Sequence, residues 1–161
     1  MFSARFVDTA LERARWRFTA NYRVLRTLQL GVEFNAAAEE LGPLLTWYWL
    51  TETHTKPALF AGTSSDRIGS PPHTQSYYLT LAKHIPRTPL APYVSLNYSE
   101  WDKGFNVPFG ANITLPKNFA LRPMFDGARA HLVLTYYHRQ SSFSAMYVWF
   151  EKIGVAMSLG L

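Results

Sequence analysis

The segment from Phe143 to Leu161 alternates along its whole length between two kinds of side chain. From Ile153 onward, one parity is bulky and apolar, and the other holds only small residues: Gly154, Ala156, Ser158 and Gly160. A period of two is the period of a β-strand, because successive side chains point to opposite faces. An apolar strand must be paired on both edges, and closing a sheet into a barrel achieves this for every strand. The segment therefore predicts a closed antiparallel β-barrel.

This alternating segment is too long to be one strand. A strand that crosses a bilayer needs about 9–11 residues, and the charged pair Glu151-Lys152 interrupts the apolar parity. We therefore expect a hairpin with a two-residue turn at Glu151-Lys152, in which Phe150 pairs with Ile153. In that register, one outer face would collect residues of both strands: Met146, Val148, Phe150, Val155, Met157 and Leu159.

The chain from Trp16 onward also reads as successive strands separated by turn residues, which predicts a meander. We expect an all-β, antiparallel up-and-down barrel of roughly eight to twelve strands, with about ten as the best estimate. Before it, Phe2, Phe6 and Ala10 recur at i+4 and Ser3 can cap a helix, so the pattern predicts a helix over Ser3 to Arg13. The expected organisation is a short helical segment at residues 1–14 and a barrel domain at residues 15–161.

Composition narrows the classes of protein that fit. Charged residues make up only 17% of the chain, against roughly 25% in average soluble domains, while aromatic residues reach 16%. Cysteine is absent, which excludes disulfides and thiolate metal sites. The net charge of +5 comes from scattered residues, so we expect no nucleic-acid partner. No apolar run is long enough for a transmembrane helix, and Met1 to Arg17 contain no apolar core of signal-peptide length.

Alternation alone does not decide which face of the barrel points outward. Glycine occurs repeatedly on the parity opposite the bulky apolar residues, as at Gly31, Gly110, Gly154 and Gly160, and suits a crowded lumen. Charged residues on the polar parity would be costly in lipid but useful inside. The candidate lumen-lining residues are Arg15, Arg17, Arg23, Glu33, Arg122 and His131.

Aromatic residues gather near the expected strand ends, as in the girdles of membrane barrels. They include Trp16, Tyr22, Phe34, Tyr77, Tyr93, Tyr98, Trp101, Phe105, Phe119, Tyr136 and Tyr137. High aromatic content is also ordinary for any strand. Together with the glycines, the girdles favour an apolar outside. We predict that the following residues point out of the barrel: Leu28, Leu30, Val32, Val107, Phe109, Ile113, Leu132, Leu134, Val155, Met157 and Leu159.

The strand at Ile153 to Leu161 resembles the terminal strand of bacterial outer-membrane β-barrel proteins, and the hairpin at residues 112–121 is similar to their short periplasmic turns. The resemblance implies a bacterial outer-membrane location, with membrane lipid and a larger envelope assembly as partners. It implies a structural or narrow-pore, porin-like role without enzymatic activity, and no cofactor is expected.

Two other functions remain open from the sequence. One is a soluble lipocalin-like barrel that binds an apolar ligand, and the other is a membrane lipid-modifying enzyme that uses His and Ser on the barrel wall. No familiar catalytic or nucleotide-binding motif is present, and the histidines lack metal-site spacing. For His131 we expect a packed lumen position. For Arg17 and its neighbours we expect ion pairs with lumen carboxylates such as Glu33, since buried charges need partners.

Overall fold

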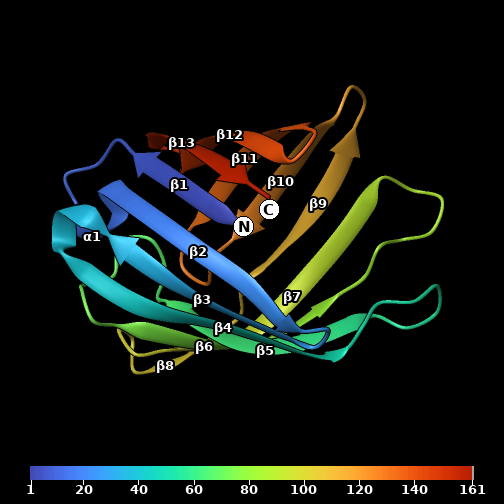
Figure 1. Ribbon diagram of the computed structural model, residues 1–161, viewed down its shortest axis with the longest axis horizontal. Helices are drawn as coiled ribbons and strands as arrows, with labels where there is room; N and C mark the ends of the chain where they lie inside the picture. The colour runs from blue at the N-terminus through green and yellow to red at the C-terminus, as the bar shows by residue number, and fades with distance from the viewer. Residues whose placement is uncertain (161) are drawn as a thin grey trace.

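The computed structural model describes residues 1–160 as one ring of antiparallel β-strands (Figure 1). The strands are β1 (Phe2–Val7), β2 (Trp16–Leu25), β3 (Leu28–Asn35), β4 (Glu40–Leu50), β5 (Ala58–Ser65), β6 (Gln75–Ala82), β7 (Leu90–Ser99), β8 (Gly104–Asn106), β9 (Phe109–Leu115), β10 (Phe119–Phe125), β11 (Ala130–His138), β12 (Ser141–Val148) and β13 (Lys152–Leu159). Leu161 lies outside the described residues.

Pairing of neighbours along the chain, followed by pairing of β13 with β1, closes this ring. The expected fold, an antiparallel up-and-down barrel, is therefore confirmed. The strand number is not ten: of the 13 strands, only β8 lies outside the ring, which leaves twelve. A wider ring follows, because the diameter of a barrel grows with the number of its strands.

The extra strand β8 continues β9 in the same register against β7. Asn97 lies opposite Asn106 in β8, and Leu90 lies opposite Ile113 in β9, so both pairs follow one antiparallel ladder. The interruption falls at Val107 and Pro108, where proline has no N–H to give to a ladder. The Pro108 carbonyl still accepts a hydrogen bond from the Ser95 N–H at 2.8 Å, which holds the interrupted strand in place.

The expected helix over Ser3 to Arg13 is wrong. Phe2–Val7 is strand β1, and the only α-helix among the described residues is α1 (Glu12–Arg15). The apolar positions Phe2, Ala4 and Phe6 fit a period of two as well as a helical period, and pairing with both β13 and β2 selects the strand. The barrel therefore begins at β1 rather than at residue 15.

The C-terminal hairpin is present, but its expected register is wrong. Tyr147 lies opposite Ile153 and Val148 opposite Lys152, so the turn contains the three residues Trp149, Phe150 and Glu151. Because this turn has an odd number of residues, even-numbered residues of β12 lie opposite even-numbered residues of β13 and share a face with them. Met146 and Val148 consequently face the inside, and Val148 is only 1% exposed.

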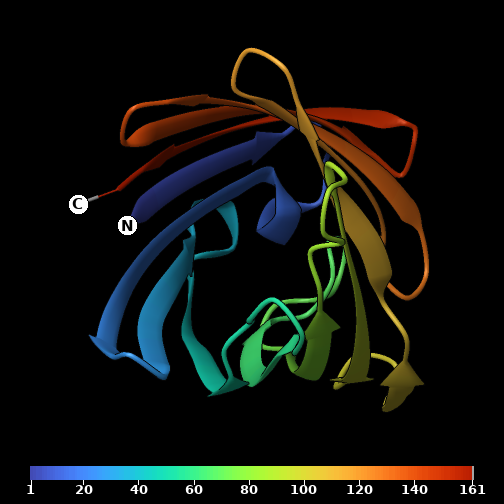
Figure 2. The ribbon, with the colours of Figure 1, turned by 90° about the vertical axis from the view of Figure 1, so that its right-hand side faces the viewer.

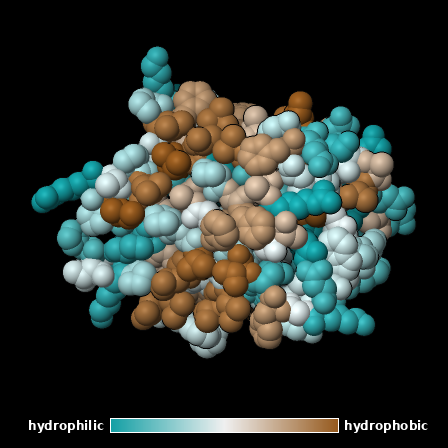
Figure 3. Space-filling view, turned by 180° about the vertical axis from the view of Figure 1, so that it is seen from behind, coloured by the Kyte–Doolittle hydropathy of each residue, from teal (hydrophilic) through white to brown (hydrophobic). Residues whose placement is uncertain are grey.

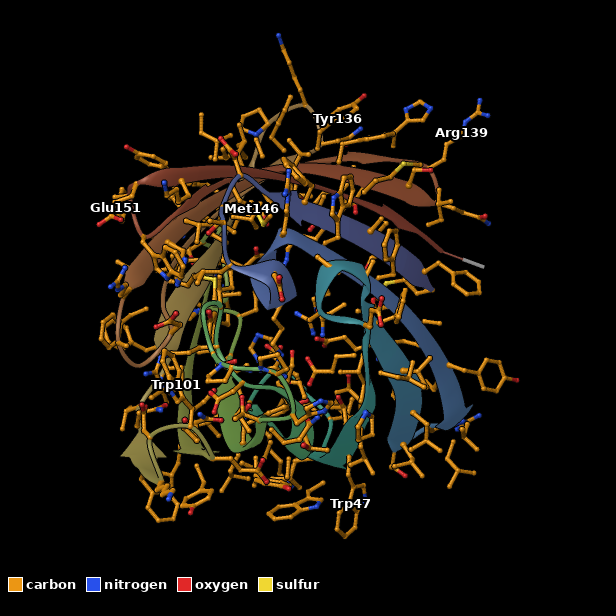
Figure 4. The ribbon with its side chains drawn as sticks, turned by 90° about the vertical axis from the view of Figure 1, so that its left-hand side faces the viewer. Trp47, Trp101, Tyr136, Arg139, Met146 and Glu151 are labelled. Carbon is orange, nitrogen blue, oxygen red and sulfur yellow. The ribbon has the colours of Figure 1, made fainter. Side chains whose placement is uncertain are left out.

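The outer wall is apolar. Of the eleven residues predicted to point outward, eight are at least 40% exposed, and Leu28, Ile113 and Leu132 are partly exposed on the same face. None of the eleven lines the internal cavity. Figure 4 shows Trp47 and Tyr136 projecting away from the ring and Met146 on its inner side. In the space-filling view, hydrophobic residues gather in patches over the wall, and hydrophilic side chains project from both ends (Figure 3).

One mouth of the barrel holds structure of its own. The helix α1 between β1 and β2 appears inside the ring of strands (Figure 2). The 3-10 helix η1 (Ala36–Ala38) lies at the same end, between β3 and β4, and contacts α1. The loop of residues 66–74 between β5 and β6 also belongs to this mouth, where it meets Arg13 of α1. These segments position the polar groups described next.

Candidate functional site

The interior of the barrel contains a cavity of about 640 Å³ whose wall combines charged and hydroxyl-bearing side chains with apolar ones. Its charged lining residues are Arg5, Arg13, Arg17, Glu33, Asp66, Arg67, Arg122, Asp126 and His131. Hydroxyl groups of Ser142, Ser144, Ser158 and Thr135 line the wall formed by β11, β12 and β13. Strands far apart in sequence thus bring one set of ionisable and hydroxyl groups to one space.

Arg17 and Glu33 form an ion pair on the inner face of β2 and β3. Glu33 is 1% exposed, and its Oε1 also accepts a hydrogen bond from Asn35 Nδ2 at 2.9 Å. An ion pair between Arg17 and Glu33 was expected inside the barrel, and such a pair could have crossed the lumen. This pair instead joins neighbouring strands, because Glu33 lies opposite Thr19, two residues from Arg17 on the same face.

A second ion pair closes the mouth that contains α1. Arg13 Nε lies 2.8 Å from Glu40 Oε2, and both side chains are almost fully buried. The rest of the Arg13 guanidinium donates to the loop between β5 and β6: to Ser70 Oγ, to the Pro71 carbonyl at 2.8 Å, and to Thr74 Oγ1 and carbonyl at 2.9 and 2.7 Å. One side chain on α1 therefore ties α1, β4 and this loop together.

Asn35 connects the two ion pairs. Its Nδ2 bonds Glu33 and also approaches Glu40 Oε2 at 3.4 Å. Glu40 Oε1 in turn accepts a hydrogen bond from the His73 N–H at 2.6 Å. A continuous polar network runs from Arg17 on the wall to the loop in the mouth, and we call these residues (Arg13, Arg17, Glu33, Asn35, Glu40) the mouth network.

The loop between β5 and β6 is also tied to the loop after β7. Arg67 makes two hydrogen bonds to Asp102, and its guanidinium lies 4.4 Å from the centre of the Trp101 ring. Asp66 Oδ2 accepts a hydrogen bond from Ser99 Oγ at 2.6 Å. The hydrogen bonds from Arg67 hold the pKa of Asp102 below its ordinary value, and the carboxylate raises the pKa of Arg67. These contacts hold the loop over the mouth.

His131 is 4% exposed and both of its ring nitrogens are engaged. Nε2 lies 2.7 Å from Asp126 Oδ2, and Nδ1 accepts the Trp149 N–H at 3.4 Å. Burial raises the pKa of Asp126, but hydrogen bonds from His131 and from the Arg129 and Ala128 N–H groups outweigh it and lower the pKa below the ordinary value. Both ring nitrogens of this histidine therefore have a partner on the chain, the more distant one being the Trp149 N–H.

The six candidate lumen residues fall into two groups. Arg17, Glu33, Arg122 and His131 line the cavity. Arg15 does not: it is exposed at the end of α1, because the strand expected to contain it begins only at Trp16. Arg23 is exposed near the opposite mouth, where its guanidinium lies 5.0 Å from the centre of the Tyr48 ring.

Sequence reasoning missed Arg5, Arg13, Asn35 and Glu40. Arg5 and Arg13 were hidden in the expected helix, and Glu40 belongs to a segment read as a loop. The signal for Asn35 was available, because it shares its parity with Glu33 on the same strand.

Within residues 1–160, no helix has the length and apolarity needed to cross a membrane. The same residues contain no group of three or more His, Asp or Glu side chains arranged to hold a metal ion. Comparison with protein-family models, with curated proteins and with solved structures finds no match to this chain.

Proposed function

We propose that this protein is a small outer-membrane β-barrel with a structural or narrow-pore role and no enzymatic activity. The observation that carries the proposal is that polar side chains are buried and large apolar side chains are exposed, which is the reverse of the distribution in a protein that folds in water. Among residues 1–160, the buried apolar side chains are only Val7, Ala14, Ala120 and Val148, whereas the buried polar and charged residues number twelve.

The outer wall supports the proposal energetically. Ile153, Val155 and Val32 are 68%, 54% and 49% exposed, and similar residues surround the ring. Burying one such side chain stabilises a protein in water by about 1.5–3 kcal/mol, and this fold forgoes that gain at most of its large apolar residues. In a bilayer the same wall contacts acyl chains, so the exposure carries no penalty and membrane lipid becomes the partner.

Aromatic side chains at both ends of the wall fit the two interfaces of a membrane. Trp16 and Phe105 are exposed near the mouth that contains α1, and Tyr22 and Trp47 are exposed near the other. Rings of this kind sit at headgroup level in membrane barrels.

The mouth network argues for a restricted rather than a wide pore. Arg13 and Glu40 stand in one mouth with the loop between β5 and β6 bound to them. A solute that passed along the barrel would have to displace contacts of this buried pair. We propose that the lumen conducts weakly or not at all while the network is intact.

The alternatives receive less support. A lipocalin-like barrel needs an apolar interior for its ligand, and here arginines, carboxylates and hydroxyls share the cavity wall with apolar side chains. A lipid-modifying enzyme of the kind considered above needs a base free to activate a nucleophile, and both nitrogens of His131 are bound.

Two substitutions on neighbouring strands test the location. Val155→Arg places a charge in the middle of the outer wall, and Ser142→Gln, introduced in place of a second arginine because the cavity already holds several, places an uncharged polar side chain inside as the control. In lipid, the first should oppose folding into vesicles by about 2–4 kcal/mol, while the second is tolerated. Folding is measured by the mobility of unheated samples on a gel. A Val155→Arg variant that folds as well as wild type, together with a detergent-free monodisperse wild type, would overturn the proposal.

A further inference from the structure

Two arginines lie side by side on the inner face of the barrel. Arg5 on β1 is the direct cross-strand partner of Arg17 on β2, and both line the cavity. Side chains opposite each other in an antiparallel pair have Cβ atoms about 4.5–5.5 Å apart, and like charges at such positions repel. The arrangement therefore needs compensating negative charge.

The chain supplies one carboxylate to this pair. Glu33 is bound by Arg17, whereas Arg5 forms neither an ion pair nor a side-chain hydrogen bond within the described residues, and its Nε is buried without a partner. The other acidic groups on the cavity wall and in the mouth are already engaged: Glu40 binds Arg13, Asp126 binds His131, and Asp66 accepts a hydrogen bond from Ser99 Oγ. Two guanidiniums in the cavity, those of Arg5 and Arg122, are thus left without a bound carboxylate among the described residues, and Arg5 is the one that lies beside a second arginine.

The wall on the other side of Arg5 offers hydroxyl groups at the same level. Arg5 lies opposite Ala156 on β13, Ala156 opposite Ser144 on β12, and Ser144 opposite Thr135 on β11. Ala156, the residue between Arg5 and Ser144, has a small side chain and lines the cavity as they do. Ser144 and Thr135 are hydrogen-bonded at 2.9 Å, and since one hydroxyl donates to the other, one hydroxyl hydrogen of the pair is free to point at a ligand.

We propose that this row of residues (Arg5, Arg17, Ala156, Ser144, Thr135) is a binding site for a small oxyanion, such as phosphate, sulfate or the phosphate group of a small solute. The planar guanidinium of Arg5 supplies paired N–H donors that match two oxygens of such a group. The hydroxyl pair supplies a further donor from the opposite side. The bound anion neutralises a charge that would otherwise be costly in the interior.

The proposal goes beyond a membrane role and does not depend on it. The site needs only the inward polar face, so it would exist equally in a barrel that proved to be soluble. The same titration is then done without detergent, and its result is independent of the vesicle experiment with Val155→Arg.

The test is isothermal titration of the purified barrel with inorganic phosphate in a nonionic detergent, at constant ionic strength with chloride as the background. Wild type should bind one phosphate per barrel. Arg5→Gln should weaken binding at least tenfold, and Arg5→Lys should fall between the two because it keeps the charge but loses the bidentate geometry. Arg139→Gln, at an exposed turn, is the matched control and should bind as wild type does.

Thermal unfolding separates this role from a merely structural one. In anion-poor buffer, Arg5→Gln should unfold at the same or a higher temperature than wild type, because it removes an unpaired charge. Saturating phosphate should raise the unfolding temperature of wild type by roughly 5–10 °C at one hundred times its dissociation constant, and leave Arg5→Gln unchanged. Glycerol phosphate in place of phosphate distinguishes a site for phosphomonoesters from one for the free ion, and binding of either supports the site.

Three results would overturn the inference. Wild type would bind neither phosphate nor sulfate, or Arg5→Gln would bind phosphate as tightly as wild type. The third is that Arg5→Gln unfolds several degrees below wild type in anion-poor buffer, which would show that Arg5 is already paired within the chain.

Discussion

Arg13 and Glu40 meet in the mouth of the barrel, with 2.8 Å between Nε and Oε2, although they come from a short helix and from the start of a strand. Glu40 also holds the His73 N–H, and Arg13 also holds Thr74. This contact therefore holds the loop between β5 and β6 over the mouth from one side, while Arg67 and Asp102 hold it from the other.

Arg13→Ala should destabilise the barrel by about 3–5 kcal/mol, because it leaves Glu40 buried without its counter-charge. The free energy of unfolding is measured by urea titration in detergent. Arg15→Ala, two residues further along and exposed, should change it by less than about 0.5 kcal/mol. Equal effects of the two substitutions would show that the contact with Glu40 does not stabilise the fold. In a planar bilayer, Arg13→Ala should also conduct more than wild type.

Glu33→Ala should lower stability by about 2–4 kcal/mol, because Arg17 and Arg5 would then face each other without a carboxylate. The double variant Glu33→Ala/Arg17→Ala should recover part of the lost stability, because it also removes the arginine that Glu33 binds. Thermal unfolding, together with planar-bilayer conductance, checks this expectation. A large, stable conductance in wild type with no loss of stability in Glu33→Ala would mean that the lumen is an open pore.

Stability should fall on acidification through the loop carboxyl groups. The pKa values of Asp126 and Asp102 are lower in the folded protein than their ordinary value, so the folded state binds protons less readily than the unfolded chain. Their contribution is complete above about pH 5 and is lost as pH falls below about 4 toward the lowered values. Unfolding temperatures between pH 7 and pH 3 should show a shallower acid decline in Asp126→Asn than in wild type. Asp8→Asn, at an exposed position, serves as the control. If the unfolding temperatures of Asp126→Asn and wild type fell in parallel with pH, the expectation would be contradicted.

Gly110→Ala should be destabilising by about 1–3 kcal/mol, since a new methyl group would lie 2.7 Å from the Pro123 carbonyl oxygen and 2.8 Å from the Tyr93 hydroxyl. The Pro123 carbonyl is backbone and has no alternative rotamer. Gly104→Ala is the matched control, because its nearest neighbour would be 3.7 Å away. The free energy of unfolding of both variants is measured by urea titration. A Gly110→Ala barrel as stable as the Gly104→Ala barrel would refute the steric argument.

The alternation of the chain was sufficient to predict the barrel, because a period of two is a local property of each strand, and the glycines and charged residues on one parity were sufficient to predict the facing of its wall. It was insufficient for β1, where Phe2 and Phe6 satisfy both a helical and a strand period. Only the long-range pairing with β13 resolves that ambiguity, and no local pattern contains it. The strand number was therefore underestimated.

The contacts of the polar site could also be predicted from the sequence only in part. Arg17 and Glu33 share a parity on adjacent hairpin strands, so their contact could be anticipated. The partnership of Arg13 with Glu40 could not, because it depends on how α1 and the loop between β5 and β6 fold back into the mouth. Local periodicity carries no information about such loop positions.

The pairing of Phe2 with Leu159 has a consequence for how the molecule forms. Every other neighbouring pair in the ring joins strands that follow each other closely in the chain, and such hairpins close within microseconds. The seam between β1 and β13 joins segments separated by almost the entire chain, so it carries the largest single entropic cost of loop closure in the ring. Until the last strand arrives, the nascent sheet has two open edges. Closure of this seam is therefore expected to be the slowest step in forming the ring.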